Sequence, residues 1–308
     1  MEKRWDVLGV GCAAVDDLLY VRGYPPADAK VPVERRERQC GGLTATALVA
    51  AARQGAKCAY AGALGRDELS RFILKTLALE QIDISPVGVH EQAGPFHSTI
   101  IVDQTAHTRN IFFEAPVVTG PISTSPTDEQ VRSTRVLLVD HHGGAATVRV
   151  QKAARAAGVS VVADLERDDW ANFAEILALS EHLVIPQRFA ARITGRDRPE
   201  DAAAALLRPE NQIVVVTCGA QGCWAISSGQ REARFFPAFP VDTVDTTGCG
   251  DTFHGVYAAQ LAHGATLDER IRRASAAAAL KATCHGGQKG IPTRGDVDRF
   301  LQARSAGG

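Results

Sequence analysis

Short apolar runs alternate with longer segments of helical period along most of this chain. The apolar runs are rich in β-branched residues and too short for buried helices, so each predicts a strand buried on both faces. Strands and helices that alternate in this way build a parallel sheet with helices on both sides, which predicts a doubly wound α/β fold. The expected strands are Val7–Val10, Lys57–Ala61, Val136–Val139, Val159–Ala163, Leu183–Ile185 and Ile213–Thr217, and the expected helices between them are Leu43–Arg53, Asp67–Glu80, Val148–Ala157, Trp170–Leu179 and Glu200–Leu207.

The last third of the chain and two internal segments break this alternation. Helical segments follow one another near the C-terminus, at Thr252–Ala262, Leu267–His285 and Asp296–Arg304. Leu18–Arg38 and Phe96–Phe113 instead have a period of two, which predicts antiparallel strands that stand off the main sheet. Their expected strands are Leu18–Val21, Val31–Arg38, Ser98–Val102 and Asn110–Phe113. Because the chain has no internal repeat and no low-complexity linker, we expect residues 1–308 to form a single domain.

Composition argues against several classes of protein. A chain of 308 residues with 45% apolar and 22% charged residues buries a large core without disulfides. The net charge of −1 does not fit a protein dedicated to nucleic acid or to a membrane surface, and no apolar run is long enough for a membrane span. The seven cysteines are scattered, odd in number and without a CxxC pair, which is typical of a reduced compartment. We therefore expect a soluble cytoplasmic protein that binds neither nucleic acid nor membrane.

The run Asp245-Thr246-Thr247-Gly248-Cys249-Gly250-Asp251 precedes the helix-forming stretch Thr252–Leu261. Small residues at a helix N-terminus leave backbone N–H groups free to bind an anion, and the helix dipole favours negative charge there. A carboxylate such as Asp251 repels an anion, but it suits a general base that takes a proton from an attacking hydroxyl. The pattern therefore predicts a phosphoryl-transfer site. An ordinary Asp N-cap after a glycine-rich loop is the alternative.

The longer pattern Asp-Thr-x-Gly-x-Gly-Asp resembles the signature of the PfkB, or ribokinase-like, family of carbohydrate kinases, and the resemblance covers nearly the whole chain. Further segments similar to motifs of this family are Gly11 with Asp16 five residues later, Gly41-Gly42 before the helical run Leu43–Arg53, Thr217–Gly222 and Gly286–Pro292. Tyr24-Pro25-Pro26 and Phe253-His254-Gly255 look most like the ketohexokinase and sulfofructose kinase branch. The resemblance implies a ribokinase-like fold, with a mostly parallel sheet flanked by helices and a small antiparallel β-lid from about residues 17–38 and 96–115.

The resemblance also implies an ATP-dependent sugar kinase that uses Mg²⁺ and forms a homodimer through the lid. It makes Asp251 the catalytic base and the backbone of Gly248, Cys249 and Gly250 the anion hole. The residues implied for the sugar are Asp16, Gly41, Gly42, Thr46 and Lys30, and those implied for the nucleotide are Thr217, Gly219, Gly222, Arg109 and Gly287. Asp245 and Thr247 match residues that help form a monovalent-cation site in ribokinase, so K⁺ is a further expected cofactor.

Several positions depart from the family pattern. Leu43 replaces the usual polar residue after the glycine pair, and Thr46 stands where asparagine is usual, so the identity of the sugar stays open. The family's Asn-x-x-Glu motif reads Gln187-Arg188-Phe189-Ala190, without the glutamate. Asp164 and Glu166 are then candidates to hold Mg²⁺ through water, with ordinary strand-end polar residues as the alternative.

Other residues keep two readings. Lys30 and Arg109 are either site residues of the lid or ordinary surface and strand-edge charges. His141 and His142 are adjacent on an extended chain and should point to opposite faces, so we expect no shared metal ion, and one of them is a candidate to face the sugar. The segment Gly9–Ala14 matches a dinucleotide-binding fingerprint, but the helix that should follow is missing, which argues against an NAD-dependent oxidoreductase.

Charge at the expected sugar site bears on the substrate. Asp16 and Asp17 make the site negative, which favours uncharged sugars over sugar phosphates. His142 falls where the sulfofructose branch carries an arginine, and a neutral imidazole is a poorer clamp for an anion. We therefore expect a neutral ketohexose or pentose, with a sulfosugar or a nucleoside as the alternative. The non-enzymatic alternative is a sugar- or nucleotide-binding sensor, against which the intact glycines and Asp251 argue.

Overall fold

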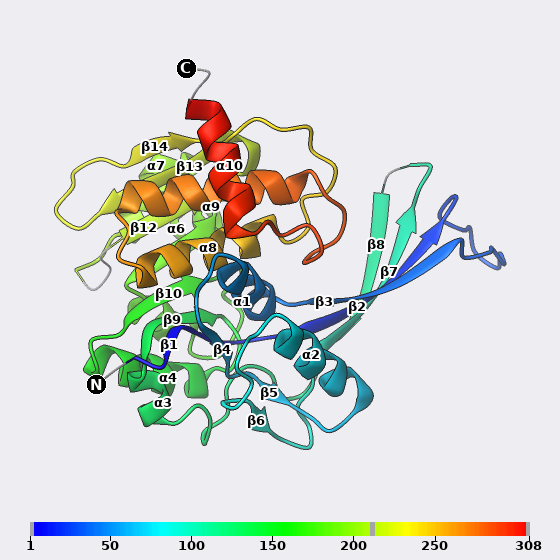
Figure 1. Cartoon of the computed structure of the whole chain (residues 1–308), viewed down its shortest axis with the longest axis horizontal. Helices are drawn as coiled ribbons and strands as arrows, with labels where there is room; N and C mark the ends of the chain where they lie inside the picture. The colour runs from blue at the N-terminus through cyan, green and yellow to red at the C-terminus, as the bar shows by residue number, and fades with distance from the viewer. Residues whose placement is uncertain (1–2, 107, 210–212, 306–308) are drawn as a thin grey trace.

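An eight-stranded sheet runs through the body of the molecule in the computed structural model, which describes residues 3–106, 108–209 and 213–305 (Figure 1). In the order in which they lie side by side, its strands are β14 (Arg234–Pro237), β13 (Gly222–Ser227), β12 (Ile213–Thr217), β11 (His182–Pro186), β10 (Ser160–Asp164), β9 (Thr134–Asp140), β1 (Trp5–Val10) and β4 (Cys58–Tyr60). Neighbours from β12 to β4 are parallel, whereas β13 and β14 are added antiparallel at one edge. This is the mostly parallel sheet that the alternation predicts.

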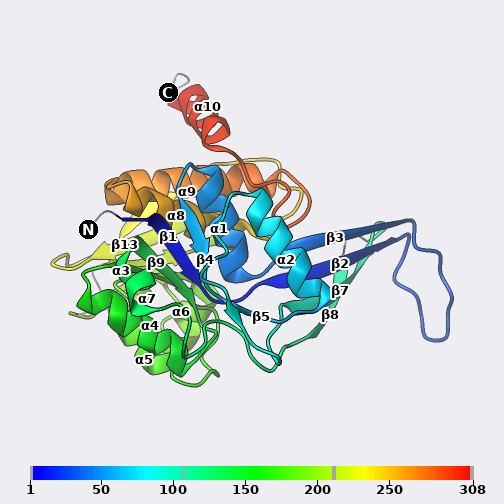
Figure 2. The ribbon, with the colours of Figure 1, turned by 60° about the horizontal axis from the view of Figure 1, so that its bottom comes forward.

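Helices cover both faces of this sheet (Figure 2). On β9, Val136 and Leu138 point into one core while Leu137 and Val139 point into the other, as expected for a strand buried on both faces. The first core is closed by α1 (Leu43–Arg53), α2 (Glu68–Leu79), α8 (Cys249–Ala262), α9 (Leu267–Ala282) and α10 (Arg294–Ser305), and the second by α3 (Asp128–Arg132), α4 (Ala145–Ala156), α5 (Phe173–Ala178), α6 (Gln187–Thr194) and α7 (Pro199–Leu206).

A second sheet forms a lid that projects from the body (Figure 1). Its strands lie in the order β3 (Arg35–Gly41), β2 (Ala14–Val21), β7 (Phe96–Asp103) and β8 (Thr108–Glu114). The outer pairs are antiparallel, but β2 and β7 run parallel, so the expectation of an antiparallel lid is wrong for its central pair. A period of two specifies a strand with two unlike faces, and it does not specify the direction of the neighbouring strand. A third, two-stranded sheet pairs β5 (Ala63–Leu64) with β6 (Gly88–Val89).

The expected elements of the body are present, with shifts at their ends. The lid strand expected at Val31–Arg38 begins only at Arg35, and the helix expected to reach His285 ends at Ala282. Sequence reasoning did not foresee α3, α6, β13 or β14. β13 follows β12 after only a single turn of 3₁₀-helix (Gly219–Gln221) and runs antiparallel to it, and β14 in turn runs antiparallel to β13.

Helices α1 and α8 touch through their backbones. Gly255 of α8 has no room for a side chain, because a Cβ there would overlap the carbonyl oxygen of Ala47 and lie 2.9 Å from the Cβ of Ala50. The residue ahead of α1 is Gly42, with a φ of 90°, and the residue ahead of α8 is Gly248, with a φ of 77°. Glycine adopts both conformations at low cost. The two helices that begin at the candidate sugar and phosphate glycines are therefore packed into one unit.

Candidate active site

The N-terminus of α8 presents unpaired backbone amides. Gly248 is its N-cap, and the amide of Cys249 donates to the carbonyl oxygen of Thr246 at 3.2 Å. Within the described ranges, no partner is found for the amides of Gly248, Gly250 and Asp251. These three amides remain available to an anion at the positive end of the helix dipole. Of the residues expected to form the anion hole, Cys249 alone has its amide engaged in the turn.

The Asp251 carboxyl lies in the first turn of α8 and is partly buried. Burial raises its pKa well above the usual range, and the neighbouring carboxylates of Asp164 and Glu166 raise it further. A carboxylate with a raised pKa holds a proton more tightly than an ordinary one. This property suits a base that accepts a proton from a hydroxyl group.

Asp164 and His254 form a buried pair next to this base. Nδ1 of His254 lies 3.3 Å from Oδ2 of Asp164 and 2.8 Å from the carbonyl oxygen of Gly250. Nε2 lies 2.8 Å from the carbonyl oxygen of Val184. Carbonyl oxygens only accept hydrogen bonds, so a protonated ring nitrogen donates to the carbonyl that it faces. The charge interaction with His254 lowers the pKa of Asp251, against the larger effects of burial and of the carboxylates.

The Asp164 carboxylate has room for a cation. Asp164 is 3% exposed, and neither of its carboxylate oxygens accepts a hydrogen bond in the described part of the chain. No group of three or more His, Cys, Asp or Glu side chains among the described residues could hold a metal by itself. Asp164, with the exposed Glu166 nearby, therefore fits a Mg²⁺ ion that is held mainly by phosphate oxygens and water.

A cavity of about 560 Å³ opens beside the anion hole. Its walls include Thr217, Gly219 and Gly222 from the turn between β12 and β13, together with Cys249 and Gly250 from the start of α8. Side chains from α9 and from the segment after β14 complete a mainly apolar lining. The volume lies within the range of roughly 300–1,000 Å³ usual for small-molecule sites. The structure thus brings the three expected nucleotide residues of this turn together with the anion hole.

Asp245 holds the loop ahead of the anion hole. Its Oδ1 accepts from the amide of Thr247 and its Oδ2 from the amide of Gly286, both at 2.9 Å. Burial alone would raise the pKa of Asp245, but these hydrogen bonds lower it below the usual range. Arg109 reaches over from the lid, contacts Oγ1 of Thr247 and lies 3.5 Å from Oδ1 of Asp245. The lid arginine and the two residues expected at a monovalent cation therefore meet at one loop.

The segment around Gly287 joins the phosphate side to the sugar side. Its carbonyl oxygen would lie 2.7 Å from a Cβ on Gly248, and its amide donates to Oε1 of Gln39 in β3 at 3.2 Å. Nε2 of the next residue, Gln288, donates to Oγ1 of Thr46 at 3.1 Å. Thr46 is only 1% exposed, so the structure places it beneath the site and bonded to Gln288 rather than at the sugar-facing surface.

Asp16 lies against the glycine pair. A Cβ on Gly41 would be 2.5 Å from Oδ2 of Asp16, and a Cβ on Gly42 would be 2.6 Å from the Cα of Ala13. Burial raises the pKa of Asp16, while a hydrogen bond from Ser98 lowers it. A carboxylate beside bare glycine backbone can accept hydrogen bonds from two vicinal hydroxyls. The structure thus brings Asp16, Gly41 and Gly42 together.

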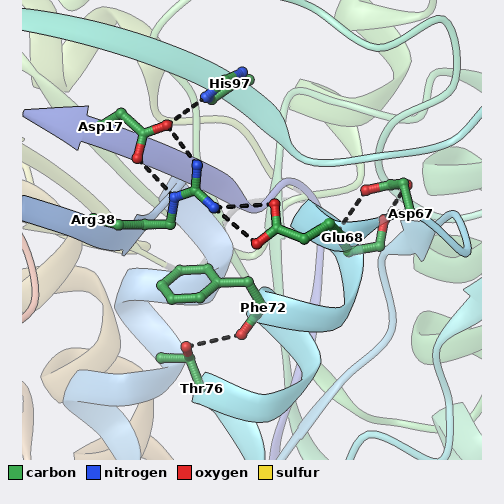
Figure 3. A network of polar contacts seen from close by, with 8 residues as sticks. Asp17, Arg38, Asp67, Glu68, Phe72, Thr76 and His97 are labelled. Carbon is green, nitrogen blue, oxygen red and sulfur yellow. Dashed lines mark hydrogen bonds and ion pairs between the residues drawn. The ribbon is translucent and has the colours of Figure 1, made fainter.

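Asp17 binds Arg38 and His97 of the lid rather than the region around Gly41 and Gly42 (Figure 3). Arg38 donates to its two carboxylate oxygens at 2.7 and 2.8 Å, and Nε2 of His97 lies 2.8 Å from Oδ2. The same guanidinium donates to Glu68 at the start of α2, at 2.8 and 3.0 Å. The hydrogen bonds from Arg38 lower the pKa of Asp17 to about 2. Arg38 therefore fastens the lid to α2, and the negative charge expected from Asp17 at the sugar is neutralised.

Lys30 is not brought to this group. It is exposed in the loop between β2 and β3. That loop lies at the end of the lid farthest from the body (Figure 2).

His141 and His142 lie side by side, with ring centroids 4.3 Å apart. The expectation that they point to opposite faces is wrong, because β9 ends at Asp140 and the chain turns directly after it. The His142 ring centroid is 5.0 Å from that of Phe96 and 4.6 Å from that of Trp170. Nδ1 of each histidine and Nε1 of Trp170 are buried without a partner among the residues described. Burial lowers the pKa of His141 to about 4 and lowers that of His142, so both rings are neutral.

Sequence reasoning assigned no role to three buried polar residues, Asp140, His254 and Lys281. Asp140 accepts from the amide of Cys12 at 2.7 Å and from the hydroxyl of Thr44 at 2.8 Å, and so ties β9 to the glycine-rich turn and to α1. A carboxylate at the carboxyl end of a parallel strand is the signal that could have found it. The signal for Lys281 is a lysine inside an alanine-rich helix, where a buried residue is expected.

The family model and the individual relatives that match this chain all describe kinases of small sugars or ribosides. The model of pfkB family carbohydrate kinases matches residues 10–294. The chain is 29% identical to a fructokinase from Klebsiella pneumoniae, covering 92% of this chain and 99% of that protein. It is 28% identical to a ribokinase from Bacillus subtilis (95% and 98% covered) and 28% identical to an aminoimidazole riboside kinase from Salmonella typhimurium (86% and 88% covered).

Solved structures match over almost the whole chain. A candidate ribokinase from Agrobacterium tumefaciens has a TM-score of 0.89 at 29% identity, covering 99% of each chain. The ribokinase of Arabidopsis thaliana, solved with ribose and ATP, has a TM-score of 0.86 at 22% identity, covering 98% of this chain and 99% of that one. The ribokinase-like fold expected from the motifs is confirmed. Among the described residues, no helix combines the length and the apolar character needed to cross a bilayer.

Proposed function

Because this chain belongs to the pfkB family of carbohydrate kinases, we propose that it transfers the γ-phosphoryl group of ATP to a primary hydroxyl of a small neutral sugar. The observation that carries this proposal is the position of Asp251, a base with a raised pKa beside three amides that have no partner among the described residues, at the edge of a cavity of about 560 Å³. The remaining site residues form two groups around Asp251, one for the nucleotide and one for the sugar.

In the nucleotide half, the adenosine part of ATP occupies the cavity, next to Thr217, Gly219 and Gly222. The phosphates extend toward the anion hole, where the amides of Gly248 and Gly250 bind the γ-phosphoryl oxygens. Mg²⁺, when bound, supplies charge neutralisation on the phosphates, and Asp164 and Glu166 are the residues that would hold it. Arg109 adds positive charge from the lid.

The chemical step is an in-line displacement. The sugar hydroxyl oxygen forms a bond to the γ-phosphorus while the bond from that phosphorus to the bridging oxygen of ADP breaks. Asp251 takes the hydroxyl proton, and its raised pKa makes it a stronger acceptor than an ordinary carboxylate. The amides at the start of α8 stabilise the charge on the transferring group.

In the sugar half, Asp16 accepts hydrogen bonds from sugar hydroxyls, and Gly41 and Gly42 let the ring approach the backbone. The contacts favour a neutral sugar. His141 and His142 are neutral and so are poor clamps for a sulfonate or a phosphate, and Arg109, whose charge acts on Asp16, is already bound to Thr247 and Asp245. A ketohexose or a pentose fits this chemistry better than an anionic sugar.

One observation favours a nucleoside as the second candidate. The rings of Phe96, His142 and Trp170 form a cluster at the base of the lid, where Phe96 pairs with Ala14, two residues before Asp16. Aromatic rings stack well on a flat base. The free nitrogens of the cluster could also bind polar atoms of such a base.

A panel of acceptors tests the proposal. ATP consumption would be followed with fructose, ribose, fructose 6-phosphate, sulfofructose, adenosine and aminoimidazole riboside, each with Mg²⁺. We expect the highest kcat/KM with a neutral ketohexose or ribose. A higher kcat/KM with an anionic sugar would refute the ranking, and turnover of nucleosides alone would select the second candidate. Binding of ATP without turnover of any acceptor would favour a sensor.

A further inference from the structure

Lys281 is a buried lysine in the last turn of α9. Its exposed fraction is 0%, and it sits in the run Ala276–Ala282, whose other members are mostly alanine. Its Nζ donates to the carbonyl oxygen of Asp245 at 3.0 Å and to that of Cys284 at 3.2 Å. A lysine is rarely buried to this extent unless its charge has partners.

The contact with Asp245 distinguishes this lysine from an ordinary helix cap. Lysines near a helix C-terminus commonly bond to the last carbonyls of their own helix, and the bond to Cys284 is of that local kind. The Asp245 carbonyl belongs to the loop that leads into the anion hole. The same loop is docked on the end of α9 by the amides of Val244 and Asp245, which donate to the carbonyl oxygen of Ala282 at 2.8 and 3.1 Å. Lys281 therefore joins α9 to the phosphate-binding loop.

The residues expected to hold K⁺ do not fit a free ion here. Both carboxylate oxygens of Asp245 accept from backbone amides, and its carbonyl oxygen accepts from Lys281. The hydroxyl of Thr247 contacts Arg109. A lysine ammonium and a potassium ion both carry a single positive charge and both are bound by oxygen atoms. The Asp245 carbonyl and the Thr247 hydroxyl, which would bind the ion, are already bound by the cationic side chains of Lys281 and Arg109.

We propose that the Lys281 ammonium replaces the monovalent cation of this site: it supplies the fixed charge that positions the Asp245–Gly248 loop, so that the kinase works without K⁺. The inference rests on the proposed function in so far as the loop serves phosphoryl transfer. Lys281 is a positioning residue, because it acts on the anion hole through the loop and makes no contact with the reacting atoms. Replacing the lysine by alanine should recreate a place for an added cation.

The experiment compares the wild type with Lys281→Ala and Lys281→Met in K⁺, NH₄⁺, Na⁺ and the bulky tetramethylammonium ion. Alanine leaves the space of the side chain empty, whereas methionine fills most of it without a charge. We expect the wild type to have the same kcat, KM for ATP and melting temperature in every salt. Lys281→Ala should lose about tenfold or more of its kcat in tetramethylammonium, because charged hydrogen bonds to the loop are lost. K⁺ or NH₄⁺ should restore much of that loss in Lys281→Ala and little of it in Lys281→Met.

The melting temperature gives a readout that does not require turnover. K⁺ should raise that of Lys281→Ala by about 2 °C or more over tetramethylammonium, and should leave those of the wild type and Lys281→Met unchanged. Lys75→Ala is the matched control, since Lys75 is an exposed helical lysine, and it should behave like the wild type in every salt.

Two results would overturn the inference. One is activation or thermal stabilisation of the wild type by K⁺, which is measurable even if Lys281→Ala fails to fold. The other is a Lys281→Ala variant that folds and shows no response to K⁺ or NH₄⁺. Failure of the proposed function has a different outcome, since the wild type would then phosphorylate no acceptor in any salt while the melting temperatures still test the cation site.

Discussion

At the scale of single residues, the chemistry depends on charges that are kept out of water. Burial and the nearby carboxylates of Asp164 and Glu166 raise the pKa of Asp251, and the charge interaction with His254 opposes that effect. The sequence indicated Asp251 because its position after two glycines has a chemical meaning. It could not indicate His254, whose bonding pattern depends on β11 and β10 lying against α8 in the folded chain.

The first prediction concerns the base. Asp251→Asn keeps the size of the side chain and removes its capacity to accept a proton, so kcat should fall by roughly 10²–10⁴-fold. ATP affinity, measured by calorimetry, should change little because the amides of the anion hole are untouched. A variant that keeps near-normal kcat would exclude Asp251 from proton transfer.

The second prediction concerns pH. The pKa of Asp17 is about 2 in the folded protein and 3.8 without its partners, so the unfolded chain binds more protons between these values. The stability due to Asp17 is therefore complete above pH 3.8 and is lost as pH falls toward 2. In urea denaturation between about pH 5 and about pH 2.5, the free energy of unfolding of Asp17→Asn should fall less steeply than that of the wild type, by about 1 kcal/mol after allowing for solvent screening.

Glu68→Gln is the control for this pH effect. Glu68 also binds Arg38, but its side chain is 65% exposed. Its variant should follow the wild-type pH curve. Equal slopes for Asp17→Asn and the wild type would contradict the assignment.

At the scale of elements, the body was predictable and the additions to it were not. Strands buried on both faces and helices with a clear period can be recognised in the sequence, and α1 was expected at its observed bounds. β7 runs parallel to β2 because the chain returns to the lid at the same end at which β2 begins, with Phe96 opposite Ala14. No local sequence pattern encodes that point of return. Likewise, His141 and His142 were placed on an extended chain that in fact ends one residue earlier.

The third prediction concerns the contact between α1 and α8. In Gly255→Ala the new methyl group meets the backbone of Ala47, which cannot move aside alone. We expect a loss of about 1–3 kcal/mol in the free energy of unfolding, measured by chemical denaturation. Gly295→Ala in α10 is the control, because a Cβ there would lie 3.4 Å from the flexible end of Arg299 and 3.9 Å from the hydroxyl of Thr293, and it should be neutral or slightly stabilising. Similar stabilities for the two variants would refute the close packing.

At the scale of the whole molecule, the lid leaves an apolar edge uncovered. Ile111, Phe112 and Phe113 of β8 are 50%, 55% and 61% exposed, and β8 is the outermost strand of its sheet. An exposed edge strand with large apolar side chains tends to associate. This supports the expected homodimer through the lid.

The fourth prediction tests that dimer. The double variant Ile111→Lys/Phe113→Lys places two charges on one face of the strand and should shift the protein toward the monomer in analytical ultracentrifugation. Val117→Lys, at an 80% exposed position outside β8, should leave the association unchanged. A wild-type protein that is monomeric at assay concentrations would refute the proposed dimer.

The backbone contact between α1 and α8 has a consequence for how substrate preference can change within this architecture. The close contact at Gly255 fixes α1, which begins at the sugar glycines, against α8, which begins at the phosphate glycines. The distance between the bound sugar and the bound ATP is therefore set by the body and not by the lid. The side-chain contacts that fasten the lid to that body include Arg38 with Glu68 and Arg109 with Thr247. Exchange of the lid strands between relatives should therefore transfer the choice of sugar while the reaction platform stays intact.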